Sequence, residues 1–138
     1  MKEEFIKLET AELAVSKGFK EHCECRWVYQ RKHTLYDLRR GEDITFEETP
    51  PRITNYNGYD KYEINLAPAP SQGFLQKWLR EEHGLHPHIC WIEGNDWHVD
   101  VYKWKEENGL MSSPNAYKHY KTYEEALEVG LNLMLDLI

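Results

Sequence analysis

Apolar residues recur at helical spacing in three segments of the chain. Near the N-terminus the pattern ends at Gly18, which predicts a helix over residues 3–17 with a glycine after its last turn. In the middle of the chain Ser71 is a good N-cap, and the pattern ends at Gly84. Near the C-terminus Thr122 begins a Thr-x-x-Glu capping box, so the sequence predicts a third helix from there to the end.

Two stretches rich in β-branched and aromatic residues, 25–30 and 62–66, predict strands that pair with each other. The segment between them contains Pro-Pro and Asn-Tyr-Asn-Gly sequences and a turn-like Arg-Arg-Gly. These signals indicate a surface excursion, and the sequence does not place residues 31–60 in helices or strands.

A Gly-Asn pair at 94–95 predicts a β-hairpin between strands 88–92 and 97–102, because these residues suit a two-residue turn. The register that this turn favours pairs Cys90 with Val99 and puts both on the face that packs against the core. The opposite face is polar and aromatic, and we expect it to be partly exposed.

The elements follow the order α-β-β-α-β-β-α, which predicts an α+β fold in one domain spanning residues 1–138. We expect one mostly antiparallel sheet of about four strands, with the three helices packed on one of its faces. Residues 105–121 form a long connection, which predicts either a functional loop or an edge strand near residues 117–120.

The balance of charge restricts the function. The chain has 17 basic and 24 acidic residues and a net charge of −7, which argues against a nucleic-acid-binding protein, since phosphate contacts need Lys and Arg. Three cysteines form no disulfide framework. With no signal peptide pattern and no apolar run of membrane-spanning length, we expect a cytoplasmic protein that does not contact a membrane.

Three blocks carry a family resemblance: residues 14–19 with Cys23 after them, residues 69–84, and residues 120–127. In these blocks the chain resembles a widespread group of small uncharacterised proteins from Bacteroidetes genomes and their phages. Residues 26–65 match that group poorly. The resemblance implies a protein of phage or mobile-element type, and it assigns no activity to any residue.

His86 and His88 alternate on a strand and share a face, so together they could chelate one metal ion. In the predicted register His98 lies on the opposite face, and Cys90 is too far along the strand to join the pair. A third ligand would have to come from His22, Cys23, Cys25 or His119. We therefore expect no metal site, and His86 and His88 remain the candidate pair.

Basic residues beside aromatic ones give the candidate ligand-binding sites. In the middle helix Lys77 and Arg80 flank Trp78, which could stack on a base or help to hold an anion, although its spacing from Phe74 also suits a buried side chain. The other candidates lie on the hairpin and the connection after it: His98, Trp104, Tyr117, Lys118 and Tyr120.

The sequence leaves three hypotheses for the function. We favour a non-enzymatic binding protein, without a cofactor, whose target is a host protein or a small anionic ligand. A nucleic-acid-associated protein that uses the Lys/Arg-aromatic clusters is the alternative. A hydrolase that depends on His86, His88 or His98, with or without a metal, is the third. Under each hypothesis an exposed hairpin face or an unpaired sheet edge could make the protein a homodimer.

Overall fold

The computed structural model describes residues 4–55, 63–105, 109–112 and 118–138, and for residues 104, 105 and 109–112 it describes the backbone alone. The helices of this part of the chain are α1 (Leu8–Ser16), α2 (Gln72–His83) and α3 (Tyr123–Asp136). The strands are β1 (Cys25–Gln30), β2 (His33–Asp37), β3 (Glu42–Phe46), β4 (Thr49–Asn55), β5 (Glu63–Pro68), β6 (Leu85–Glu93), β7 (Asp96–Lys105) and β8 (Gly109–Ser112).

The α+β class is confirmed, but the prediction of one sheet of about four strands is wrong. The described strands form three separate antiparallel sheets, with the orders β4-β1-β5, β2-β3 and β6-β7-β8. The predicted strands near 25–30 and 62–66 do pair with each other, as β1 and β5. The extra strands come from the segment that the sequence did not place and from the connection after β7.

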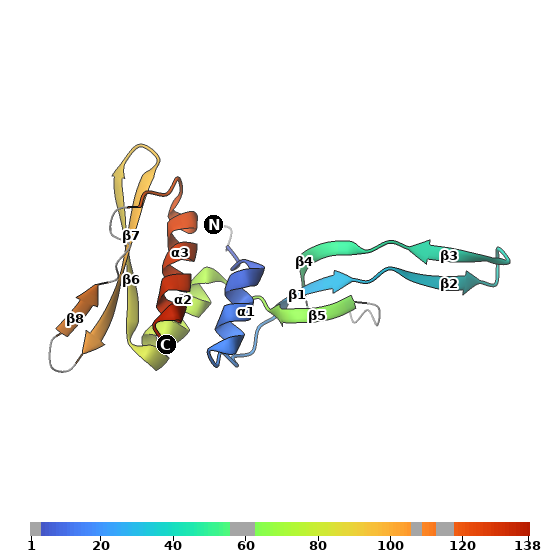
Figure 1. Ribbon diagram of the computed structural model, residues 1–138, viewed down its shortest axis with the longest axis horizontal. Helices are drawn as coiled ribbons and strands as arrows, with labels where there is room; N and C mark the ends of the chain where they lie inside the picture. The colour runs from blue at the N-terminus through green and yellow to red at the C-terminus, as the bar shows by residue number, and fades with distance from the viewer. Residues whose placement is uncertain (1–3, 56–62, 106–108, 113–117) are drawn as a thin grey trace.

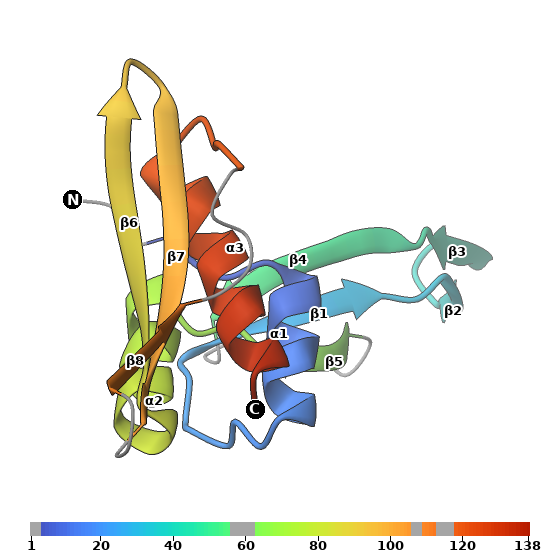
Figure 2. The same ribbon diagram turned by 60° about the vertical axis from the view of Figure 1, so that its left-hand side comes forward.

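Helix α3 occupies the centre of the molecule. It packs on β6 and β7 on one side and against α1 and α2 on the other, while α1 in turn contacts β5. Figures 1 and 2 show the β4-β1-β5 sheet beyond α1, with β2 and β3 extending further in the same direction. The core therefore lies between the three helices and the β6-β7-β8 sheet.

Helix α1 begins at Leu8 rather than at residue 3, because the chain before it is extended. Phe5 forms an antiparallel bridge with Ser71, and the Ile6 N–H donates to the Pro70 carbonyl over 3.2 Å. The carboxylate of Glu128 on α3 then accepts hydrogen bonds from the Lys7 N–H over 2.6 Å and from the Thr10 hydroxyl over 2.7 Å. The start of α1 is thus capped by a side chain from another helix, which the local sequence could not indicate.

The predicted N-caps of α2 and α3 and the predicted glycines after α1 and α2 are confirmed. The Ser71 hydroxyl accepts the Phe74 N–H over 3.1 Å, and the Thr122 hydroxyl accepts the Glu125 N–H over 3.1 Å. Gly18 has φ +99°, and Gly84 ends α2 in the left-handed conformation. These helix ends depend on local chemistry, which explains why the sequence predicts them well.

Two of the three blocks that carry the family resemblance meet in the core. The Phe19 ring packs edge-on against Phe74 at 6.1 Å and against Trp78 at 5.2 Å between centroids. The third block begins α3, where Ala126 and Leu127 are buried. The blocks therefore contribute to the core, and residues of the first two also line a surface cavity of about 330 Å³, among them Cys23, Ala69, Pro70, Ser71 and Phe74.

The register of the β6–β7 hairpin differs from the predicted one by one residue. Trp91 pairs with Trp97, and Cys90 pairs with His98 rather than with Val99. An irregularity between Trp91 and Glu93 lets Glu93 pair with Asp96 around the Gly94–Asn95 turn. Such a bulge moves every following residue of the strand to the other face.

Candidate functional site

Strands β2 and β3 form a two-stranded ribbon that projects from the rest of the molecule (Figure 1). We call residues 31–48 the arm. No described helix or strand makes an extensive contact with β2 or β3, apart from the contact of these strands with each other. All described core residues lie outside residues 29–66, so the arm contributes nothing to the core.

The pairing of the arm separates apolar from polar side chains. His33 lies opposite Phe46, with their rings stacked at 4.8 Å, and Leu35 lies opposite Ile44. We call these four residues the apolar face of the arm. The other face carries a pair of threonines, Thr34 and Thr45, whose hydroxyl oxygens lie 3.2 Å apart, and the pair Tyr36 and Asp43.

The apolar face is open to solvent. Leu35 is 37% and Phe46 is 40% exposed, and Leu38 at the turn is 88% exposed. A shallow cavity of about 390 Å³ lies along this part of the arm, and its lining residues are Leu35, Tyr36, Asp37, Leu38, Arg39, Ile44 and Phe46. Exposed apolar side chains that gather on one face of a strand pair are typical of a contact surface.

The two halves of the arm carry opposite charge. Residues 31–40 contain four basic side chains and one acidic one, whereas residues 42–48 contain four acidic side chains and no basic one. Across the strands Lys32 and Glu47 are 4.0 Å apart, with their side chains 65% and 75% exposed. The acidic residue of the first half, Asp37, lies 3.7 Å from the Arg40 guanidinium.

A groove lies where the arm joins the body of the protein. It has a volume of about 540 Å³ and is lined by Leu8, Glu12, Tyr29, Glu48, Thr49, Pro50, Pro51 and Leu66. Its lining combines apolar side chains with two carboxylates, Thr49 and the Tyr29 hydroxyl, and it contains none of the four residues of the apolar face.

Candidate site residues from both strands lie together on the polar face of the β6–β7 hairpin, although the sequence placed some of them on opposite faces. Because of the shifted register, His88 lies opposite Asp100 and Cys90 lies opposite His98, so the prediction that His98 faces away from His88 is wrong. The His98 Nε2 atom is 3.2 Å from the Asp100 carboxylate, and Cys90 Sγ is 3.4 Å from His88 Nε2. The other carboxylate oxygen of Asp100 is buried and has no hydrogen-bond partner.

His86 shares this polar face, opposite Tyr102. His119 comes near from the connection before α3, with its ring 6.5 Å from that of His98. Even so, within the described residues no three His, Cys, Asp or Glu side chains are placed to hold a metal ion. As it stands, the face offers paired hydrogen-bonding groups rather than a coordination site.

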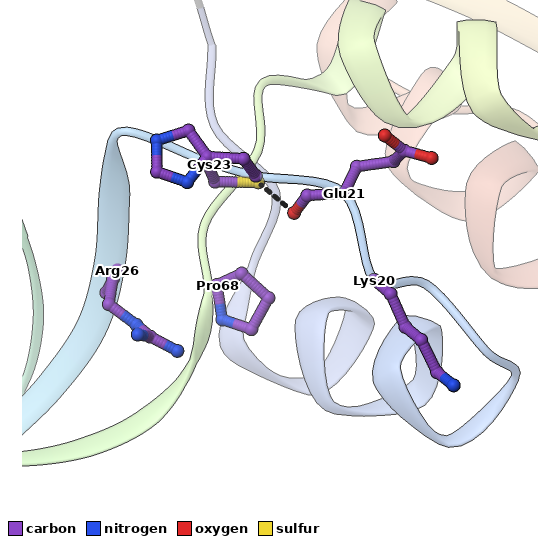
Figure 3. Close-up of a pocket in the computed structure, with 6 residues that line it drawn as sticks. Lys20, Glu21, Cys23, Arg26 and Pro68 are labelled. Carbon is purple, nitrogen blue, oxygen red and sulfur yellow. Dashed lines mark hydrogen bonds between the residues drawn. The ribbon is translucent and has the colours of Figure 1, made fainter.

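A second cavity surrounds Cys23, whose thiol lies 3.6 Å from the Glu21 carbonyl (Figure 3). It has a volume of about 320 Å³ and is lined by Lys20, Glu21, His22, Cys23, Arg26 and Pro68. Burial raises the pKa of the Cys23 thiol, Arg26 opposes this effect, and Cys25 and Glu21 add to it. A raised pKa keeps the thiol neutral, which is the opposite of what an activated nucleophile needs.

The candidate ligand-binding residues of α2 do not form a stacking platform. Trp78 is buried, with its ring packed between Phe19 and His83. Lys77 and Arg80 are exposed on the same helix. Lys77 and Arg80 therefore lie on the solvent-exposed face of an amphipathic helix, and Trp78, the candidate aromatic residue beside them, is buried in the core.

The second basic-aromatic cluster lies elsewhere. Tyr120 forms a bridge with Trp97 beside the turn of the hairpin, and Lys118 near it is exposed. Helix α2 leads instead into Leu85, at the far end of β6, so the two clusters lie at opposite ends of the hairpin (Figure 1). Tyr120 forms only an isolated bridge, and the strand that the structure describes in this connection is β8, so an edge strand at the described residues 118–120 is not found. Tyr117 and the side chain of Trp104 lie outside the described residues.

Comparison of the chain with models of protein families, with curated proteins and with solved structures found no match. None of the helices in the described ranges is both long enough and apolar enough to cross a membrane. The site must therefore be judged from its own geometry.

Proposed function

We propose that the protein is a non-enzymatic protein-interaction module, of phage or mobile-element type, whose contact surface is the apolar face of the arm. The observation that carries this proposal is the exposure of Leu35 and Phe46, with the half-buried Ile44 between them, on one side of a ribbon that contributes nothing to the described core. An exposed apolar surface on a strand pair lowers the solubility of a protein unless a partner covers it.

The size of the arm supports the same conclusion. A two-stranded hairpin by itself is marginally stable in water, because one strand pair buries little apolar surface. The described part of the arm is nonetheless formed of two fully paired strands, from His33–Phe46 to Asp37–Glu42. A partner that packs on the apolar face would bury these side chains and stabilise the ribbon.

Photo-crosslinking in bacterial cells tests this proposal. A photoreactive phenylalanine analogue is placed at Phe46, on the apolar face, and in a matched variant at Thr45, which is exposed on the opposite face. We expect protein adducts from position 46 and few from position 45. Equal yields at the two positions, or no adduct from position 46, would refute a protein contact through this face.

A further inference from the structure

We propose that Cys23 and Cys25 form a binding site for a soft monovalent metal ion, Cu(I), which the two sulfur atoms hold between them. The site lies at the start of β1, whereas the arm begins at residue 31, after the other end of that strand. The inference is therefore independent of the proposed function and concerns a different part of the surface.

The two cysteines share one cavity. Cys25 is the first residue of β1, and Cys23 comes two positions before it, with a bend in the backbone at Glu24 between them. Both thiols are free and half-buried, and both line the surface cavity of about 330 Å³. In an extended chain the Cα atoms of residues two positions apart are separated by about 6.6 Å, and a bend shortens this distance. The two side chains are thus placed to meet over one ion.

The electrostatics of Cys23 agree with this placement. Burial raises the pKa of the Cys23 thiol, Arg26 opposes that effect, and the charge of Cys25 adds to it. The charge of Cys25 therefore acts on the Cys23 thiol. Two neighbouring thiolates repel each other, and a cation bound between them replaces this repulsion by attraction to both.

The number and kind of ligands select the metal. Thiolates are soft ligands, which favour Cu(I) over hard ions such as Mg²⁺. Cu(I) is stable with two thiolates, whereas a structural zinc site takes four ligands. No three His, Cys, Asp or Glu side chains surround one ion in the part of the chain that the structure describes, so zinc lacks ligands here. The sequence-based expectation of no metal site rests on the missing third ligand, which Cu(I) does not require.

Positive charge near the two sulfur atoms favours the bound state. A Cu(I) ion with two thiolates carries one negative charge, and helix N-termini stabilise negative charge. Helix α2 begins at the same cavity, which Ser71 and Phe74 also line, and its first turn contains no acidic residue. Arg26 favours the thiolate of Cys23, whereas Glu21 acts in the opposite sense and is the weakest of these influences.

Binding requires little rearrangement of hydrogen bonds. Both thiols lose their protons to solvent and two copper–sulfur bonds form, while copper and sulfur keep their oxidation states. The Cys23 thiol donates only to the Glu21 carbonyl, over 3.6 Å, and a thiol is a weak donor. Loss of this contact is a small cost against two bonds to a metal.

Competition with bicinchoninate, a coloured chelator of Cu(I), tests the site in the full chain under anaerobic conditions. We expect the unmodified chain to take one Cu(I) ion. Cys23→Ser and Cys25→Ser should each weaken binding at least about a hundredfold, because even the loss of an outer-shell partner of a metal costs about 10–100-fold. Cys90→Ser is the matched control, since Cys90 is the remaining cysteine and lies on β6, and it should leave the affinity unchanged.

X-ray absorption spectroscopy of the copper-loaded unmodified chain should show two sulfur neighbours, a result that does not depend on the folding of any variant. Far-ultraviolet circular dichroism checks that each variant keeps the fold, and native mass spectrometry should show one chain with one copper ion. The inference is overturned if the unmodified chain takes no Cu(I), if Cys23→Ser or Cys25→Ser binds as tightly as the unmodified chain, or if Cys90→Ser loses as much affinity. Fewer than two sulfur neighbours, or copper held only between two chains, would overturn it as well.

Discussion

Replacing Gly130 by alanine tests the packing of α3 on the sheet. Gly130 is a buried residue inside α3, and a Cβ at this position would lie 2.9 Å from Val99 Cγ2 and 3.7 Å from Pro87 Cβ. Real Cβ atoms essentially never approach another heavy atom to 2.9 Å, so either α3 or the Val99 side chain must shift. Val99 is fully buried, and its β-branched side chain has few alternative rotamers.

Two effects of opposite sign decide the outcome. Alanine is better than glycine inside a helix by about 1 kcal/mol. Overpacking a well-filled core costs about 1–3 kcal/mol, and here the clash falls on an atom that cannot move freely. We therefore expect Gly130→Ala to lower the free energy of unfolding by about 1 kcal/mol, and by up to ~2 kcal/mol if the helix must move away from the sheet.

Urea denaturation followed by circular dichroism measures this change, with Gly73→Ala as the matched control. Gly73 also lies inside a helix, but a Cβ there meets nothing within 4 Å, so this variant should be as stable as the unmodified protein or more stable. Adding Val99→Ala should remove the clash, so the double variant should lose less stability than the sum of the single changes. If Gly130→Ala stabilises the protein as Gly73→Ala does, the described packing of α3 on β7 is wrong.

Two further substitutions or titrations check other parts of the structure. Glu128→Ala removes the acceptor of hydrogen bonds from the Lys7 N–H, Thr10 and Gln72. We expect the free energy of unfolding, measured by urea denaturation, to fall by about 3 kcal/mol. A fall below ~0.5 kcal/mol would contradict the buried network. Because burial raises the pKa of Cys23 and only the thiolate reacts, its alkylation by iodoacetamide, followed by peptide mass mapping, should reach half its maximal rate at a higher pH than that of free cysteine. A midpoint at or below that of free cysteine would show that the thiol is not buried as described.

What the sequence predicted correctly depends on short-range chemistry. Ser71 and Thr122 begin helices through bonds to residues three positions later, and Gly84 ends α2 with a positive φ. The turn of the second hairpin is also set by neighbouring residues, and Gly94 has φ +52°. Each of these features needs only a few adjacent side chains, so a single sequence is enough to predict it.

What the sequence could not predict depends on residues far apart in the chain. The start of α1 is set by Glu128, 121 positions after Lys7. The face on which His98 lies is set by the bulge near Ile92, and one misplaced residue reverses a whole strand. The sequence of the arm did contain a local signal, because Leu35, Ile44 and Phe46 alternate with polar residues on either side of an Arg-Arg-Gly turn. The arm has few strongly hydrophobic residues, so the sequence did not predict its two strands.

The division between core and arm also indicates where the specificity of this protein lies. Phe19, Trp78 and the early part of α3 make buried contacts in the core. The arm contributes no residue to the core that the structure describes. A change in the arm therefore alters the exposed apolar face and its charges without a cost in core packing.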